Sequence, residues 1–287
     1  MDTVLVDKSQ GWKNILSIII PYIMTVGVFQ LIGFYFAGLD ISNYKNLHET
    51  TQQLFIITFF SLLGTVVIVW IFRKYVDGKS FTSLGFEKPF IKKDLFLGLT
   101  FGFFIMLLGF TCLILTKQIH FMGIQFRPVE FILSIGLFIF VAIAEELFLR
   151  GYILSNLMSS FNKYTALVIS SIIFSLMHTL NPGFSLLSMI GLFMAGLLFG
   201  LYYIYTKNLW FPIALHFSWN FFQGTVFGFN VSGKDTYSLI ITKENSFNIW
   251  NGGNFGFEGS ILSILFLIFA IGIVFLIFKN RLTIETS

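Results

Sequence analysis

Long apolar runs follow one another along the whole chain, and short polar segments separate them. Runs of about 18 or more apolar residues with few charges are typical of transmembrane helices. The pattern therefore predicts an all-α, polytopic membrane helix bundle of about eight transmembrane helices. The predicted spans cover residues 15–39, 53–72, 95–116, 131–160, 164–180, 184–205, 209–229 and 261–278.

The composition agrees with a membrane protein. Of the 287 residues, 56% are hydrophobic and 11% are charged, whereas soluble domains carry about 25% charged residues. The first apolar run is longer than the roughly 7–15 residues of a signal-peptide core, and it lacks a small-residue cleavage site. We therefore predict that this first helix is retained.

Basic residues are distributed unevenly between the loops. When successive loops are assigned to alternate sides, thirteen Lys and Arg residues lie on the side of the termini and five on the other. The positive-inside rule then predicts a multi-pass protein of the cell membrane, in contact with the lipid bilayer, with both termini in the cytoplasm. The Lys-, Phe- and Ile-rich composition favours a bacterial source. No nucleic-acid-binding pattern stands out beyond the basic loop 73–93.

The chain divides into three regions without an internal repeat or a low-complexity linker. Residues 1–94 hold the first two spans and the basic loop, residues 95–229 hold the core, and residues 230–287 hold a loop and the last span. The loop 230–260 is rich in Gly, Asn and aromatic residues, and we expect it to face outside, as a connector or as a cover over an opening. The pattern sets no oligomeric state.

Charged side chains interrupt one apolar span. Glu145, Glu146 and Arg150 lie within residues 131–154, and acids inside a membrane are functional-site candidates by default. Glu146 and Arg150 are four residues apart, so they share a helix face and can form an ion pair. Glu145 is rotated by about 100° from Glu146 and points elsewhere. The alternative is that all three side chains form a buried polar clamp between helices.

Two histidines lie in other apolar segments. Phe174 and His178 share one helix face, and so do His216 and Asn220. Counting from the turn between their spans places Glu145 and His178 at the same depth, about 24 Å from that turn. Two hydrogen-bond donors such as His216 and Asn220 suit a developing oxyanion. Each histidine can instead be a hydrogen-bonding residue between helices.

These residue types leave two kinds of chemistry open. A carboxylate with a histidine can activate water by general-base catalysis. Alternatively, Glu145, His178 and His216 can hold zinc or another divalent metal that activates the water. The chain lacks the HExxH spacing of a helical zinc site, which favours the absence of a tightly held metal.

Three short segments resemble the motifs of a known family. EELFLR, FSLMH and HFSWN match the patterns EExxxR, FxxxH and HxxxN in the same order. In this order, on separate spans, they resemble the CPBP (Abi) intramembrane proteases. That family includes the type II CAAX prenyl endopeptidases and bacterial relatives tied to bacteriocin processing and immunity. The resemblance covers about residues 95–229.

The resemblance implies roles for the motif residues. It assigns the activation of water to Glu145 and His178. It assigns the stabilisation of the tetrahedral oxyanion to His216 and Asn220. The supporting residues that would orient the site are Glu146, Arg150 and Phe174. The family has been described both as metalloproteases and as glutamate-dependent enzymes.

The sequence therefore predicts an intramembrane endopeptidase. Its expected substrate is a small peptide precursor or a membrane-associated protein, and its cavity is expected to open towards the cytoplasm. One alternative is a non-catalytic bacteriocin-immunity or regulatory scaffold that uses the same cavity. Another is a proton-coupled transporter, because intramembrane Glu and His also form proton relays. Transporters show paired broken helices, and this chain has no clear pair of such segments.

Overall fold

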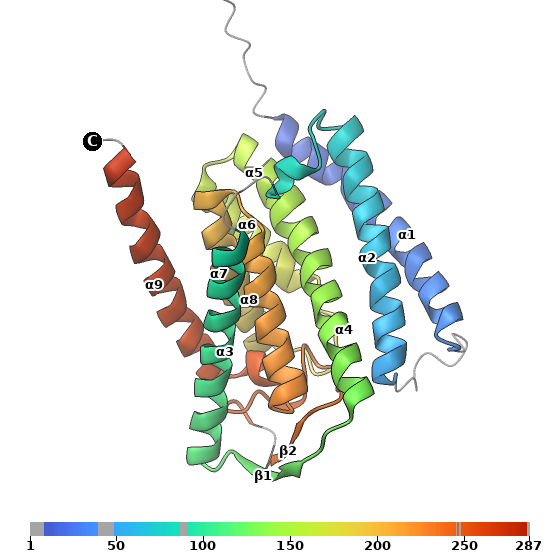
Figure 1. Cartoon of the computed structure of the whole chain (residues 1–287). Coiled ribbons are helices and arrows are strands. Elements are labelled where there is room, and N and C mark those ends of the chain that lie inside the picture. Colours follow the sequence, from blue (N-terminus) through green and yellow to red (C-terminus); the bar gives the residue numbers. More distant parts are fainter. Residues whose placement is uncertain (1–8, 40–48, 87–90, 245, 247, 286–287) are drawn as a thin grey trace, which may run out of the picture.

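Apolar helices dominate the computed structural model, as the hydrophobic pattern predicts (Figure 1). The structure describes residues 9–39, 49–86, 91–244, 246 and 248–285. The longer helices are α1 (Gln10–Phe36), α2 (Thr51–Tyr75), α3 (Ile91–Leu115), α4 (Pro128–Glu146), α6 (Lys163–Leu176), α7 (Leu186–Thr206), α8 (Trp210–Asn220) and α9 (Ile261–Glu285). A short helix, α5 (Ser155–Ser160), precedes the turn into α6.

Two of these helices continue as π-helix. The π segment Leu147–Leu154 joins α4 to α5, and the π segment Phe221–Val226 extends α8. Five helical stretches are long and apolar enough to cross a membrane, and α6 and α9 contribute shorter apolar stretches. Helices therefore occupy every predicted span, and the prediction of an all-α membrane bundle is confirmed. The span predicted to reach residue 180 ends earlier, because α6 stops at Leu176.

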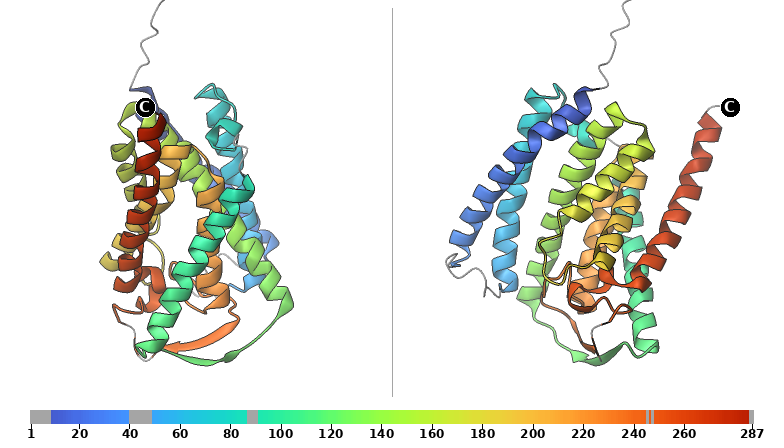
Figure 2. Two further views of the ribbon diagram at one scale, coloured as in Figure 1. Left: turned by 60° about the vertical axis from the view of Figure 1, so that its left-hand side comes forward. Right: turned by 180° about the vertical axis from the view of Figure 1, so that it is seen from behind.

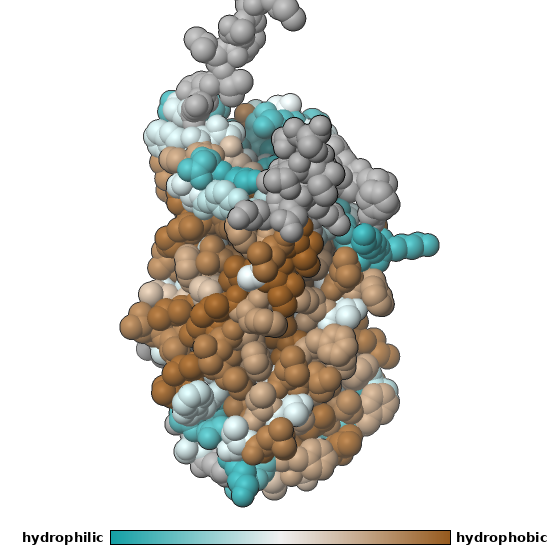
Figure 3. All heavy atoms as spheres, turned by 90° about the vertical axis from the view of Figure 1, so that its left-hand side faces the viewer, coloured by the Kyte–Doolittle hydropathy of each residue, from teal (hydrophilic) through white to brown (hydrophobic). Residues whose placement is uncertain are grey.

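The surface supports the same conclusion. Figure 3 shows a broad hydrophobic band around the middle of the molecule, with hydrophilic residues gathered at both ends. Large apolar side chains on α1, such as Ile20, Ile23 and Met24, are more than half exposed. An exposed apolar surface of this extent is typical of contact with lipid.

The helices form one bundle around a central group. Helices α4, α6, α7 and α8 lie in the middle, the α1–α2 hairpin packs beside α4, and α3 packs along α8 (Figures 1 and 2). Helix α1 begins and α9 ends at the same end of the bundle, which we call the terminal end. The opposite end carries the two strands, and we call it the sheet end.

The sheet end is more ordered than the sequence pattern indicated. Strand β1 (Ile119–Ile124) pairs antiparallel with β2 (Ile240–Glu244), with an irregularity between Phe121 and Gly123. The region 230–260, expected to be a loop, therefore contributes a strand as well as two 3₁₀ turns. Its pairing partner lies more than a hundred residues earlier, and the local apolar pattern carries no signal of that contact.

Small residues bring α3 close to α8, which carries part of the site. A Cβ atom on Gly98 would lie 2.7 Å from Ala214, and one on Gly102 would lie 2.7 Å from Ser218. The Ser218 hydroxyl donates a hydrogen bond to the Leu99 carbonyl at 2.7 Å. Small interfacial residues let membrane helices approach closely. This contact fixes the position of α8 in the bundle.

Candidate active site

The helix that carries the two adjacent glutamates changes its geometry directly after them. Glu145 and Glu146 end α4, and Arg150 lies in the π segment Leu147–Leu154. In the same way, Asn220 ends α8 where its π segment begins. Short π-helical turns inside α-helices occur frequently at functional sites, because the wider turn redirects side chains.

Glu146 and Arg150 form the predicted ion pair. Their Oε1 and Nη1 atoms are 3.0 Å apart, and both side chains are almost completely buried. Arg150 also donates to the Gly196 carbonyl at 3.3 Å, and its guanidinium lies over the rings of Phe174 and Phe199. A buried ion pair needs such additional partners to offset the loss of hydration. The spacing-based prediction of the pair is confirmed.

His216 is oriented by this ion pair. Its Nδ1 lies 2.9 Å from Glu146 Oε1, and its ring stacks on Phe199 with centroids 5.0 Å apart. Because the carboxylate of Glu146 is paired with Arg150, it accepts this hydrogen bond, and the proton sits on Nδ1. The Nε2 atom of His216 is left facing Glu145 Oε2 at 3.9 Å.

His178 faces the same carboxylate from the other side. Its Nδ1 lies 2.9 Å from the Phe174 carbonyl oxygen, and a carbonyl can only accept, so Nδ1 carries the proton. Its Nε2 therefore points at Glu145 Oε2, at 4.0 Å. The prediction that Glu145 and His178 lie at the same depth is confirmed. The ring of Phe174 also contacts the imidazole edge, with centroids 4.9 Å apart.

Glu145 differs from Glu146 in its exposure and in having no arginine partner in the part of the chain that the structure describes. Its side chain is 26% exposed, whereas that of Glu146 is fully buried. Its Oε2 atom makes no hydrogen bond to any of the residues that the structure describes. Separations of 3.9 and 4.0 Å to two imidazole nitrogens are too long for direct hydrogen bonds and leave room for one bridging water. The arrangement can hold a water between a carboxylate and two imidazoles.

A cavity of about 240 Å³ adjoins Glu145, which is enough for several water molecules. Five predicted site residues line it, namely Glu145, Phe174, His178, His216 and Asn220. Glu146 and Arg150 lie behind His216 and do not line the cavity. The cavity is therefore lined by the four residues predicted to be catalytic and by Phe174, which was predicted to support them.

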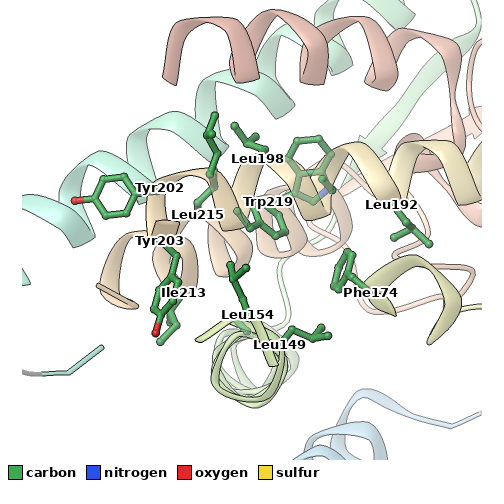
Figure 4. Close-up of a cluster of buried hydrophobic side chains, with 14 of the residues drawn as sticks. Leu149, Leu154, Phe174, Leu192, Leu198, Tyr202, Tyr203, Ile213, Leu215 and Trp219 are labelled. Atoms are coloured by element: carbon green, nitrogen blue, oxygen red, sulfur yellow. The ribbon is translucent and has the colours of Figure 1, made fainter. Parts of the chain in front are cut away.

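The cavity lies towards the sheet end of the bundle. Part of its polar lining comes from segments at that end, including Asn181, Ser232 and Thr236. The expectation that it opens on the side of the termini is therefore wrong. Buried side chains such as Tyr203 and Ile213 fill the space towards the terminal end, as Figure 4 shows. The spacing of the motifs does not reveal which end of the bundle this packing closes.

Glu145, His178 and His216 are residue types that bind metals, but the distances between their side chains are longer than those in a zinc site. Two imidazoles and a carboxylate are common zinc ligands, and tetrahedral zinc holds its donor atoms about 3.3 Å apart. Glu145 Oε2 lies 3.9 Å from the Nε2 atom of His216 and 4.0 Å from that of His178. Within the described part of the chain, no group of three or more His, Cys, Asp or Glu residues is placed to hold a metal ion. The observed spacing fits a bridging water.

One buried acid in the cavity, Glu258, lies outside the motifs. Glu258 lines the cavity, is 5% exposed, and comes from the loop region before α9. Its burial raises its pKa, and the nearby His178 and His216 act in the opposite direction. A local signal for this residue exists, because Glu258 is the single acid in the glycine- and phenylalanine-rich stretch that precedes the last span.

Comparison with known proteins identifies the segment that holds the three motifs. Residues 127–222 match the model of a family described as type II CAAX prenyl endopeptidase Rce1-like. Neither a curated protein nor a solved structure matches the chain. The matched segment includes α4, α6, α7 and α8, and with them all seven residues of the three motifs singled out above. This segment therefore matches the family that the motifs predict, the Rce1-like type II CAAX prenyl endopeptidases.

Proposed function

We propose that this protein is an intramembrane endopeptidase that hydrolyses a peptide bond with a water activated by Glu145 and His178. The observation that carries the proposal is the approach of two imidazole nitrogens to one unpaired carboxylate oxygen, at 3.9 and 4.0 Å. These three groups line one cavity inside an apolar bundle. The match of residues 127–222 to a family of endopeptidases supports the same reaction.

The proposed steps follow from which atoms of Glu145 and His178 can accept a proton or a hydrogen bond from the water. Glu145 takes one proton from the bound water while the water oxygen attacks the scissile carbonyl carbon. His178, with its proton held on Nδ1, accepts a hydrogen bond from the same water at Nε2. The C–N bond of the tetrahedral intermediate then breaks as the leaving nitrogen takes the proton from Glu145. The products are a carboxylic acid and an amine.

His216 and Asn220 are proposed to stabilise the oxyanion. The Nδ1 proton of His216 is already engaged with Glu146, so this ring can donate from Nε2 only as an imidazolium. The buried carboxylate of Glu146, which is paired with Arg150, is placed to stabilise that positive charge. Asn220 lies one helical turn further along α8 and borders the same cavity. Donors that are fixed before the reaction are the usual means of stabilising an oxyanion.

A metal ion remains compatible with the residue types at this position. Glu145, His178 and His216 would hold it, and the ion would supply a bound water of lowered pKa. The steps above use only the side chains of the chain. A chelator added to an active preparation separates the two cases, because loss of activity that zinc restores would establish a metal enzyme.

The location of the cavity bears on the substrate. The excess of basic residues on the side of the termini favours a cytoplasmic location for both termini. The cavity lies towards the opposite end, so its substrate is reached from outside the cytoplasm. This favours a peptide precursor or an external segment of a membrane protein over a cytoplasmic prenylated CAAX end. Reporter fusions at either terminus test the orientation.

The experiment is cleavage of a fluorogenic peptide panel, prenylated and unmodified, by the purified protein in liposomes. Glu145→Gln and His178→Ala serve as inactive controls. Cleavage by the unmodified protein that disappears in both variants would support the proposal and identify the substrate class. Equal cleavage in Glu145→Gln would reject it. A cellular phenotype that persists in Glu145→Gln would indicate the scaffold instead.

A further inference from the structure

A short segment of the loop region covers part of the cavity. Residues 230–236, which we call the roof, contribute Val231, Ser232, Lys234 and Thr236 to the lining. The roof folds back on itself, since Val231 and Lys234 exchange two backbone hydrogen bonds of 2.9 Å. It lies outside the segment that matches the family. The roof therefore borders the space that a substrate must enter.

Glu258 holds the roof through direct hydrogen bonds to Ser232. Its Oε1 atom accepts hydrogen bonds from both the backbone N–H and the hydroxyl of Ser232, the latter at 2.9 Å. Gln223 donates to the same oxygen at 3.3 Å and to the Asn230 carbonyl at 2.7 Å. One carboxylate oxygen therefore accepts from both the N–H and the hydroxyl of the half-buried Ser232. Glu258 thus connects the roof to the wall of the cavity.

Close backbone contacts hold both the roof and Glu258 in place. Gly233 has φ +81°, and a Cβ atom there would lie 1.9 Å from the Pro182 carbonyl oxygen. Asn181 donates to the Ser232 carbonyl at 3.0 Å. On α7, a Cβ atom at Gly191 would lie 2.1 Å from the Glu258 carbonyl oxygen. These contacts hold the backbones of the roof and of Glu258 in place, and the Glu258 side chain joins them through Ser232.

We propose that Glu258 is a positioning residue that anchors the roof over the site and thereby sets which peptides reach Glu145. This inference rests on the proposed peptidase function, and it assigns control of substrate entry to a residue outside the family motifs. A loosened roof changes the binding of the peptide more than the chemical step. The expected signature is a change in KM with a smaller change in kcat.

The test uses three variants and two measurements on the full protein in liposomes. Glu258→Ala removes the acceptor, Glu258→Gln keeps an oxygen at the same position, and Ser232→Ala removes only the hydroxyl donor. The first measurement is the steady-state kinetics of peptide cleavage. The second is the rate of tryptic cleavage after Lys234, which is exposed in the roof and needs local opening to fit a protease.

We expect Glu258→Ala to raise both KM and the rate of cleavage after Lys234 about tenfold, in line with the loss of hydrogen bonds to a charged group. Glu258→Gln should recover most of both values, and Ser232→Ala should raise the tryptic rate about threefold. An unchanged tryptic rate in Glu258→Ala would overturn the proposal. It would also be overturned if Glu258→Gln were as impaired as Glu258→Ala, since charge and not anchoring would then be the cause.

The two measurements keep the inference separate from the proposed function. Tryptic cleavage after Lys234 requires no enzymatic activity, so it tests the anchor even if the unmodified protein cleaves no peptide. In that case the peptidase proposal fails alone. If Glu258→Ala does not fold, the tryptic rate of Ser232→Ala decides, and a rate equal to that of the unmodified protein rejects the anchor.

Discussion

The floor and the roof of the cavity are built in different ways. The floor residues Glu145, His178 and His216 sit on helices or directly after one, inside the segment that matches the family. The roof, residues 230–236, and its anchor Glu258 lie in loops outside that segment, and they are held mainly by hydrogen bonds between those loops. Chemistry that depends on fixed geometry is placed on rigid elements, whereas access to the site is left to loops.

The largest effect is expected from a substitution at Glu145, one of the floor residues. Glu145→Gln should lower kcat/KM by about 10² to 10⁴-fold, because it removes the proposed proton acceptor. The melting temperature should stay nearly constant, since Glu145 Oε2 makes no hydrogen bond among the described residues. Glu130→Gln on the same helix, whose side chain is 37% exposed, is the matched control and should leave both values unchanged. Equal activity of the two variants would contradict the assignment of Glu145 as the proton acceptor.

The next largest effect is expected from loss of the ion pair between Glu146 and Arg150, which lies behind the floor residues. Arg150→Met leaves the buried carboxylate of Glu146 without its ion-pair partner and should destabilise the protein by about 3–5 kcal/mol. Adding Glu146→Gln should restore part of this stability, because the uncompensated charge is gone. Thermal unfolding in detergent measures both. Arg127→Met is the control, since that exposed pair is worth about 0–1 kcal/mol. A stable Arg150→Met would show that Glu146 is not ionised.

The third prediction concerns Asn220, which lines the cavity beside the floor residues. Asn220→Ala should lower kcat by about 10² to 10³-fold with little change in KM, as expected for a donor that acts on the oxyanion. Single-turnover and steady-state cleavage of the same peptide measure the two constants. Asn162→Ala is the matched control at the terminal end, because Asn162 caps α6 and should affect stability alone. A rise in KM without loss of kcat would make Asn220 a binding residue.

The floor was predictable because its signals are local. The ion pair of Glu146 and Arg150 follows from a spacing of four residues, and the common depth of Glu145 and His178 follows from counting along two antiparallel helices. The hydrogen bond from His216 to Glu146 was not predictable, since it joins residues seventy positions apart. The two π segments were also missed, because apolar periodicity does not distinguish them from α-helix.

The roof shows why the remainder could not be predicted. Glu258 and Ser232 meet through loop backbones packed against Gly233 and Gly191, and these contacts depend on the completed fold. The same holds for the direction of the cavity, which depends on the packing of large side chains between the helices. Hydropathy therefore predicted where helices lie along the chain, and the fold alone determined which end of the bundle the site faces.

The smallest effect concerns the sheet end, beyond the roof. Burial raises the pKa of Glu244 on β2 from 4.5 to about 7. Below pH 4.5 the group is protonated in both the folded and the unfolded chain, and above about pH 7 it is charged in both. As the pH rises between these values the unfolded chain releases its proton first, so the stability of the strand pair falls. Glu244→Gln should remove this dependence, as measured by hydrogen-exchange protection factors of the β1 and β2 amides between pH 5 and 8. If the unmodified protein and the variant lost protection equally over that range, the instability would come from the strand pairing itself and not from the buried carboxyl.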